Sequence, residues 1–257
     1  MPRDQPTPAV LRAFGAEAPA RPLDGGQGTS WAAGDLVLKP DEGPVHAWLA
    51  AVFPRIVQDG FRLAAPVRTR DGHLVHDGWT ATRWVEGGGA GTWREIIDAG
   101  RAFHRAVAHL PRPGFLDGRQ DRWALADRVA WGERDTRFHP VFAPLVPRLR
   151  AALRPLGPAQ LVHGDLGGNV LFAAGLPPAV IDVSPYWRAP AYAEGVVIAD
   201  ALSWRDAPAS LWQQLRVPAA AVARALLFRM ATTNELAEAD FDDEARRYDR
   251  AMRAIRC

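Results

Sequence analysis

The chain has 257 residues, enough to bury a sizeable core as one large domain or two small ones. Its hydrophobic share of 48%, charged share of 23% and net charge of +2 are ordinary for a globular protein, and its scattered basic residues do not favour a nucleic-acid partner. No apolar stretch is long enough to span a membrane and the single cysteine, Cys257, excludes an internal disulfide, so we expect a soluble cytoplasmic protein without membrane or nucleic-acid partners.

The first third of the sequence predicts short strands and turns around one helix. Residues 23–31, LDGGQGTSW, form a glycine-rich bend, and residues 36–39, LVLK, are typical of a buried strand. Residues 44–53 predict a short helix with Pro44 at its start. Residues 66–87 predict a hairpin around Asp71-Gly72, and the glycines of 87–91 predict a hinge.

From residue 92 onward the pattern becomes helical. A capping box of Thr92 and Glu95 opens a segment whose apolar residues recur at helical spacing up to Pro111. Further helices are expected over 121–133, 141–154, 191–204, 219–231 and 243–255, whereas 160–184 returns to the short strands QLVH, NVLF and AVID. The predicted division is therefore a small β-rich part, residues 1–86, and a larger helical part, residues 87–257.

Lysine is almost absent from the chain. Of the 31 basic residues 30 are arginine, and the single lysine, Lys39, ends the predicted strand LVLK. Because the chain uses arginine at every other basic position, the single lysine favours the interpretation that position 39 needs a compact ammonium group rather than a planar guanidinium. The alternative interpretation is that a single lysine remains by chance in an arginine-rich composition.

Polar residues interrupt the apolar run at 161–172, LVHGDLGGNVLF. Asp165 and Asn169 lie in a bend between two predicted strands, and Asp182 ends the next strand. Such residues could merely stabilise turns. Together with Lys39 and the glycine-rich bend, however, they supply the groups that phosphoryl transfer needs. These are backbone amides and an ammonium for phosphates, oxygen ligands for Mg²⁺, and a carboxylate to accept a hydroxyl proton.

These motifs carry a family resemblance. His163-Gly164-Asp165 with Asn169, followed by Ile181-Asp182, resembles the catalytic loop and metal-binding strand of the aminoglycoside phosphotransferase family. The glycine-rich bend, the strand lysine and the hinge precede them in the expected order, so the resemblance extends over most of the chain. It implies an α+β fold of the protein-kinase-like type, with a small β-rich N-terminal lobe and a larger, mainly helical C-terminal lobe.

The resemblance also implies a role for each position. Asp165 would be the catalytic base, Asn169 and Asp182 the magnesium ligands, and Lys39 the partner of the inner phosphates of the nucleotide. The other nucleotide-binding residues would be Gly25, Gly26, Gly28, Thr29 and Ser30 of the bend and Trp84, Val85 and Glu86 of the hinge segment 83–86, whose backbone would meet the adenine. The step from Asp165 to Asn169 is four residues, where the family usually has five, and the partner of Lys39 is expected to be Glu42 or His46.

The sequence therefore predicts a Mg²⁺-dependent enzyme that moves the γ-phosphate of ATP or GTP to a hydroxyl of a small-molecule acceptor. A catalytically inactive nucleotide-binding module is the alternative. A metal hydrolase is disfavoured, because no second histidine cluster accompanies His163 and Asp165. The sequence leaves open the acceptor, the choice of ATP or GTP, and the oligomeric state.

The acceptor pocket is the least defined part of this prediction. An aminoglycoside would need carboxylates for its amines, and Glu194, Asp200 and Asp206 are candidates. Trp187 and Trp204 could line such a pocket.

Overall fold

The structure, a computed structural model, describes residues 5–24, 28–41 and 43–257. The chain divides into two compact units, of which the first comprises Met1–Ala90 with Leu171–Asp182 and the second Gly91–Val170 with Val183–Cys257. This division differs from the one predicted from the sequence in two segments, because residues 87–90 and 171–182 belong to the first unit and not to the helical part.

A five-stranded antiparallel sheet is the framework of the first unit. Its strands follow the order β1 (Arg21–Pro22), β2 (Trp31–Ala33), β3 (Leu36–Pro40), β6 (Trp79–Arg83) and β5 (Pro66–Val67). The glycine-rich bend connects β1 to β2, and the Leu23 amide donates to the Ser30 carbonyl across its neck at 2.9 Å. Gly25 and Gly26 of this bend lie outside the described residues.

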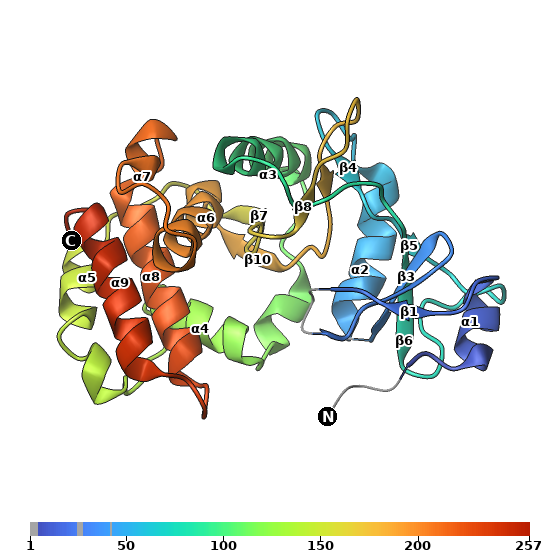
Figure 1. Cartoon of the computed structure of the whole chain (residues 1–257), viewed down its shortest axis with the longest axis horizontal. Coiled ribbons are helices and arrows are strands. Elements are labelled where there is room, and N and C mark those ends of the chain that lie inside the picture. The colour runs from blue at the N-terminus through green and yellow to red at the C-terminus, as the bar shows by residue number, and fades with distance from the viewer. Residues whose placement is uncertain (1–4, 25–27, 42) are drawn as a thin grey trace. The chain divides into compact units, whose positions relative to one another are not determined.

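The two faces of strand β3 have different environments. Leu36 and Leu38 are buried against Val10 and Phe14 of helix α1 (Pro8–Phe14). Because successive side chains of a strand point to opposite faces, Lys39 projects away from this core. Helix α2 (Pro44–Val52), continued by η2 (Phe53–Arg55), lies on the other side of the strands from α1 (Figure 1).

A second, smaller sheet explains why residues 171–182 join the first unit. Its order is β4 (Arg62–Leu63), β9 (Ala179–Val180) and β8 (Val170–Leu171), with β4 and β9 parallel. The predicted hinge approaches it closely, because Gly88 and Phe172 exchange backbone hydrogen bonds of 2.9 and 2.8 Å. A Cβ on Gly87, whose φ is 148°, would come within 2.8 Å of the Leu171 Cβ, so only glycine fits there.

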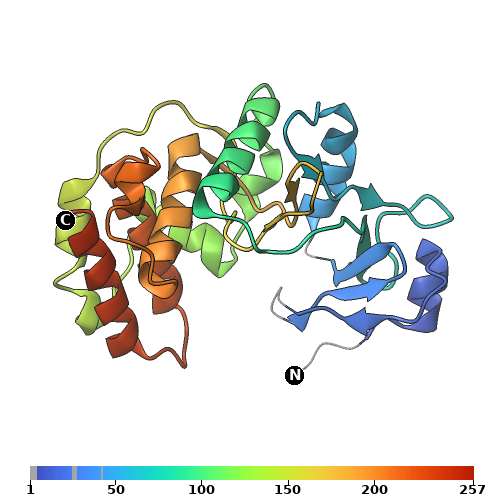
Figure 2. The same ribbon diagram turned by 45° about the horizontal axis from the view of Figure 1, so that its top comes forward.

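Helices dominate the second unit. They are α3 (Trp93–Val107), η3 (Gly114–Gly118), α4 (Arg122–Ala130), η4 (Pro140–Phe142), α5 (Val146–Ala152), α6 (Pro190–Trp204), α7 (Leu211–Gln214), α8 (Ala219–Asn234) and α9 (Phe241–Ala254). Strands β7 (Gln160–His163) and β10 (Pro185–Arg188) form an antiparallel pair in which His163 is opposite Pro185. Helices α6, α8 and α9 lie side by side in both views (Figures 1 and 2).

The core of this unit lies where α6 meets α8. Both helices are apolar on nearly every side, which is typical of helices buried all round. A Cβ on Gly195 would be 2.5 Å from the backbone of Ala221, so the two helices approach more closely than another residue there would allow.

The predicted α+β architecture is confirmed. Each segment expected to be helical contains a helix of the structure, and the capping box of Thr92 and Glu95 is present at the start of α3. Helices α1 and α7 and strand β10 were not predicted. In the described part of the chain, no helix combines the length and the apolar character that crossing a membrane requires.

Candidate active site

The single lysine pairs with a carboxylate far along the sequence. The Lys39 Nζ lies 2.6 Å from an oxygen of Asp182, and the two side chains are 31% and 44% exposed. Both residues belong to the first unit, because residues 171–182 fold against β4 and the hinge. The neighbour of Lys39 is thus one of the expected metal ligands. Glu42, one of its two expected partners, lies outside the described residues, and the buried Nε2 of the other, His46, has no hydrogen-bond partner among them.

Asp182 has an unusual backbone conformation. Its φ is +52°, in the left-handed region that residues other than glycine seldom adopt. Such a conformation persists only where the surroundings impose it, and it occurs preferentially at functional sites. The conformation and the ion pair together fix where this carboxylate points.

A tight turn brings Asp165 and Asn169 together in the second unit. The Asn169 amide donates to the Leu166 carbonyl at 3.0 Å, and Gly168 supplies a φ of +89°. The Asn169 Nδ2 then donates to the Asp165 carbonyl at 2.7 Å. The four-residue step between the two side chains is therefore closed by a turn that needs glycine.

Leu166 anchors this loop to helix α3. Its side chain is fully buried, and a Cβ on Gly100 of α3 would come within 2.3 Å of it. The glycine leaves room for the leucine, so the loop that carries Asp165 rests on a packed helix.

Arg229 of helix α8 holds the carboxylate of Asp165. Its Nη2 donates to the Asp165 Oδ1 at 2.8 Å, and its Nε and Nη2 donate to the two oxygens of Asp200 at 2.8 and 2.6 Å. The other oxygen of Asp165 receives only a long contact of 3.4 Å from Asn169. The side chain of Asp165 is 44% exposed, so this second oxygen can accept a proton from a ligand.

Two buried histidines hold the backbone around Asp165 by hydrogen bonds. The Nδ1 of His163 accepts from the amides of Asp165 at 3.2 Å and Ser184 at 3.3 Å, and the amide of His163 donates to the Nε2 of His104 at 3.0 Å. Burial, and to a smaller degree the neighbouring His163, lowers the pKa of His104 to about 3. His104 is therefore neutral at physiological pH, as an acceptor must be.

The expected nucleotide-binding residues are described in part. In the glycine-rich bend Gly28 has a φ of +69° and Ser30 is buried. In the hinge, the Trp84 amide donates to the Asp35 carbonyl at 2.8 Å and the Glu86 carbonyl accepts from Arg62 at 2.9 Å. The amide and carbonyl of Val85 have no hydrogen-bond partner among the described residues, so this stretch of backbone is open to a ligand.

The structure thus gathers the expected residues in two sets. Lys39, Asp182 and the hinge lie in the first unit, and Asp165 and Asn169 lie in the second. Sequence reasoning missed Arg229, which occurs in an apolar helical stretch, ALLFRMATT. A lone arginine within a buried helix was the available signal, because a buried charge needs partners.

The donor atoms suit magnesium. Among the described residues no three acidic, histidine or cysteine side chains gather as a metal site, but Mg²⁺ bound to phosphates needs only one or two protein ligands. The carboxylate of Asp182 has the chemistry of one such ligand. The Oδ1 of Asn169 has no hydrogen-bond donor among the described residues, because the Nδ2 is the atom fixed by the loop.

Comparison with known proteins places this geometry in context. A family model described as "Phosphotransferase enzyme family" matches residues 29–184, which is more than half of the chain. No curated protein matches the sequence.

Solved structures share the fold over nearly the full length. An aminoglycoside phosphotransferase in ternary complex with ADP and hygromycin B is 18% identical, with a TM-score of 0.60 and 96% of this chain and 97% of that chain covered. A choline/ethanolamine kinase family protein from Mesorhizobium loti is 17% identical, with a TM-score of 0.60 and 98% and 91% covered. A spectinomycin phosphotransferase in complex with ADP and spectinomycin is 13% identical, with a TM-score of 0.51 and 88% and 84% covered.

These structural likenesses confirm the protein-kinase-like fold expected from the sequence. The match of the family model covers the glycine-rich bend from Thr29 onward, the strand lysine, the hinge and the catalytic loop. The chain belongs to the phosphotransferase enzyme family.

Proposed function

We propose that the protein is a small-molecule kinase that transfers the γ-phosphate of ATP or GTP to a hydroxyl group of its acceptor. The observation that carries this proposal is the ion pair between Lys39 and Asp182. The only lysine of the chain lies beside a carboxylate 143 positions later. Phosphoryl transfer needs a cation for the phosphates and a carboxylate for the metal close to one another, and these two residues are suited to those roles.

In the proposed reaction Asp165 accepts the proton of the acceptor hydroxyl while that oxygen attacks the γ-phosphorus, and the nucleoside diphosphate leaves. Arg229 orients the carboxylate of Asp165 through its Oδ1, and the other oxygen is the one proposed to take the proton. Lys39 neutralises the phosphates that are not transferred. Asn169 and Asp182 would hold Mg²⁺, which when bound offsets the negative charge of the phosphates.

The nucleotide base is proposed to meet the hinge. Among the described residues the amide and carbonyl of Val85 have no hydrogen-bond partner, whereas the Trp84 amide donates to the Asp35 carbonyl and the Glu86 carbonyl accepts from the Arg62 side chain. The glycine-rich bend from Gly25 to Ser30, between β1 and β2, would lie over the phosphates as backbone amides do in other phosphate-binding loops. Both elements belong to the first unit.

A nucleotide-binding module without catalysis is the second candidate. One observation favours it: Arg229 already holds one oxygen of the Asp165 carboxylate at 2.8 Å, so part of the proposed base is engaged within the protein. Such a protein would bind nucleotide and use the bound state as a signal.

A single assay separates the two candidates. Purified protein is incubated with ATP or GTP, Mg²⁺ and pools of hydroxylated metabolites and antibiotics, and the release of ADP or GDP is measured. A kinase releases the diphosphate with one of the pools, and the Asp165→Asn variant loses that release while nucleotide still raises its melting temperature. Thermal stabilisation by nucleotide without release in any pool supports the binding module, and neither stabilisation nor release refutes both.

A further inference from the structure

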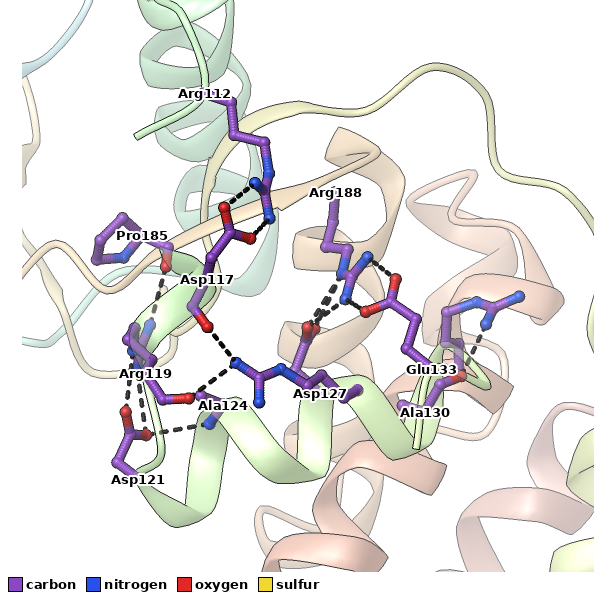
Figure 3. Close-up of polar contacts among 12 residues, drawn as sticks. Arg112, Asp117, Arg119, Asp121, Ala124, Asp127, Ala130, Glu133, Pro185 and Arg188 are labelled. Carbon is purple, nitrogen blue, oxygen red and sulfur yellow. Dashed lines mark hydrogen bonds and ion pairs between the residues drawn. The ribbon is translucent and has the colours of Figure 1, made fainter. Parts of the chain in front are cut away.

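A polar cavity lies in the second unit between η3, α4 and β10. Its volume is about 340 Å³, and its wall contains four arginines, Arg112, Arg119, Arg128 and Arg188. The side chains of Tyr186 and Trp187 from strand β10 complete it. Figure 3 shows how the polar groups of this region meet one another.

Three of the four arginines are paired with carboxylates. Arg112 binds Asp117 through two hydrogen bonds of 2.8 and 2.7 Å, Arg119 binds Asp121 at 2.9 and 3.1 Å, and Arg188 binds both Asp127 and Glu133 (Figure 3). Every carboxylate in the wall is used in these pairs. Within the described residues, the cavity therefore has no free carboxylate with which to attract a cationic ligand.

Arg128 is different, because it holds only backbone partners. Its Nη2 donates to the carbonyls of Asp117 at 3.2 Å and Arg119 at 2.8 Å, and no carboxylate of the described residues lies within ion-pair distance of it. A guanidinium has five N–H donors, and these two bonds occupy one nitrogen. The two carbonyls hold the group in place, so its remaining donors are prepared for a ligand without a further loss of side-chain freedom.

A second guanidinium without a carboxylate partner among the described residues, that of Arg224, lies over the same Trp131 ring as Arg188 of the cavity wall. Arg224 is 9% exposed and donates to the Ala130 carbonyl at 2.7 Å, with no carboxylate of the described residues in ion-pair contact. Its guanidinium lies 4.2 Å from the centre of the Trp131 ring, whose surroundings also include Arg188 at 4.7 Å. The region thus contains five arginines and four carboxylates, which leaves one excess positive charge. Because this charge is partly shielded from water, its electrostatic attraction for an anion is stronger than at an exposed position.

We propose that this cavity binds a small organic oxyanion, a molecule with a carboxylate or phosphate group, and that Arg128 is the residue that meets it. Arginine is well suited to this because its planar edge matches two oxygens of such a group. The volume exceeds that of a lone ion and lies at the lower end of small-molecule sites, and the Tyr186 and Trp187 side chains offer a surface to the organic part. The proposal does not depend on the proposed phosphotransfer.

Calorimetric titration of the full chain with inorganic phosphate and with citrate tests the inference. Both titrations use a Lys39→Gln background, because phosphate can also bind beside Lys39. We expect Arg128→Gln to weaken binding by about tenfold or more, the usual loss for charge-assisted hydrogen bonds. The matched control Arg150→Gln, on the exposed side of α5, should leave the affinity unchanged. The probe that binds more tightly tells whether the cavity prefers phosphate or carboxylate.

A second variant, Asp117→Asn, should raise the affinity for the anion probes, in contrast to Arg128→Gln. Asp117 is 66% exposed, and Arg128 uses only its backbone carbonyl, so Asp117→Asn should leave the fold unaltered. This substitution frees the guanidinium of Arg112 and should tighten the binding of either probe. No binding at millimolar concentration, equal affinity of Arg128→Gln and its parent, or tighter binding of the neutral polyol myo-inositol than of both anions would overturn the proposal.

Discussion

Lys39 and Arg229, the cations that contact Asp182 and Asp165, differ in how exposed their ion pairs are to solvent. Lys39 and Asp182 in the first unit form a pair whose side chains are 31% and 44% exposed, whereas Arg229 and Asp200 in the second unit are 14% and 19% exposed. An exposed pair contributes at most about 1 kcal/mol, so Lys39 can exchange its partner for phosphate oxygens at little cost. A buried pair with several hydrogen bonds stays as it is, because separating its charges leaves one of them unpaired.

The difference extends to the acidic residues of the helical unit. Arg101 binds the carboxylate of Glu194 through hydrogen bonds of 3.0 and 2.7 Å, and Arg229 binds that of Asp200. Two of the carboxylates that an amine-bearing acceptor would need are thus already neutralised. In the second unit these two carboxylates therefore hold structure, whereas the pair of Lys39 and Asp182 in the first unit is exposed enough to meet a ligand.

Replacing the exposed carboxylate should have the largest effect on activity. We expect Asp182→Asn to lower Mg²⁺-dependent release of ADP or GDP by at least about a hundredfold, because one charge-stabilising group at the phosphates is lost. Asparagine tolerates the positive φ of this position, so the melting temperature should change little.

Asp77→Asn is the matched control for that experiment. Asp77 also has a positive φ, is exposed, and lies 3.7 Å from His76. Its substitution should leave release of the diphosphate unchanged. An Asp182→Asn enzyme as active as the control would refute the metal assignment.

Removing the buried cation should instead affect stability. Burial raises the pKa of the Asp200 carboxyl and Arg229 opposes that shift, so Arg229→Gln leaves a buried carboxyl without its counter-charge. We expect the free energy of unfolding to fall by about 3 kcal/mol, measured by urea denaturation. The exposed Arg253→Gln, which removes an ion pair on α9, should cost less than about 1 kcal/mol. Equal losses in the two variants would show that the second unit does not depend on its buried charges as we infer.

The sequence predicted the elements well where a local pattern sets them. Helix α3 shows this, because its apolar spacing and its capping box are both local features. Family resemblance assigned Lys39 and Asp182 to one nucleotide site but gave Glu42 or His46 as the expected partner of Lys39. The pair itself was not predicted, since no local pattern connects a strand end with a residue 143 positions later. The structure supplies the connection by pairing β9 with β4.

What sequence reasoning missed depends on packing between distant segments. Strand β10, PYWR, begins with a proline and is only four residues long, so its pattern does not distinguish it from a loop, and it becomes a strand because it pairs with β7. Arg229 contacts Asp200 because α8 packs on α6, and it contacts Asp165 in the loop after β7. The Arg128 cavity likewise joins η3, α4 and β10, which no spacing in the sequence brings together.

The buried histidine under the catalytic loop predicts a pH dependence of stability. Burial lowers the pKa of His104 to about 3 from an ordinary value of 6.5, so between these values the unfolded chain binds a proton that the folded chain does not. The stabilisation is fully present above pH 6.5 and is lost as the pH falls toward 3, with a slope of about 1.4 kcal/mol per pH unit from this one group. His104→Gln should remove that slope in urea denaturation series between pH 4 and 6.5, and the exposed His109→Gln should not. An unchanged slope in His104→Gln would show that another group carries the proton.

The smallest expected effect concerns the helix cap at the start of the second unit. Thr92 accepts from the Glu95 amide at 3.3 Å, and the Glu95 side chain accepts from the Thr92 amide at 2.7 Å. The Thr92 backbone donor lowers the pKa of the Glu95 carboxyl, with a smaller contribution from the Thr92 hydroxyl. Thr92→Ala should lower the free energy of unfolding by about 1 kcal/mol and leave the Michaelis constant for nucleotide unchanged, because the cap contains none of the proposed nucleotide-binding residues. A changed Michaelis constant would contradict this expectation and would show that the start of α3 also affects nucleotide binding.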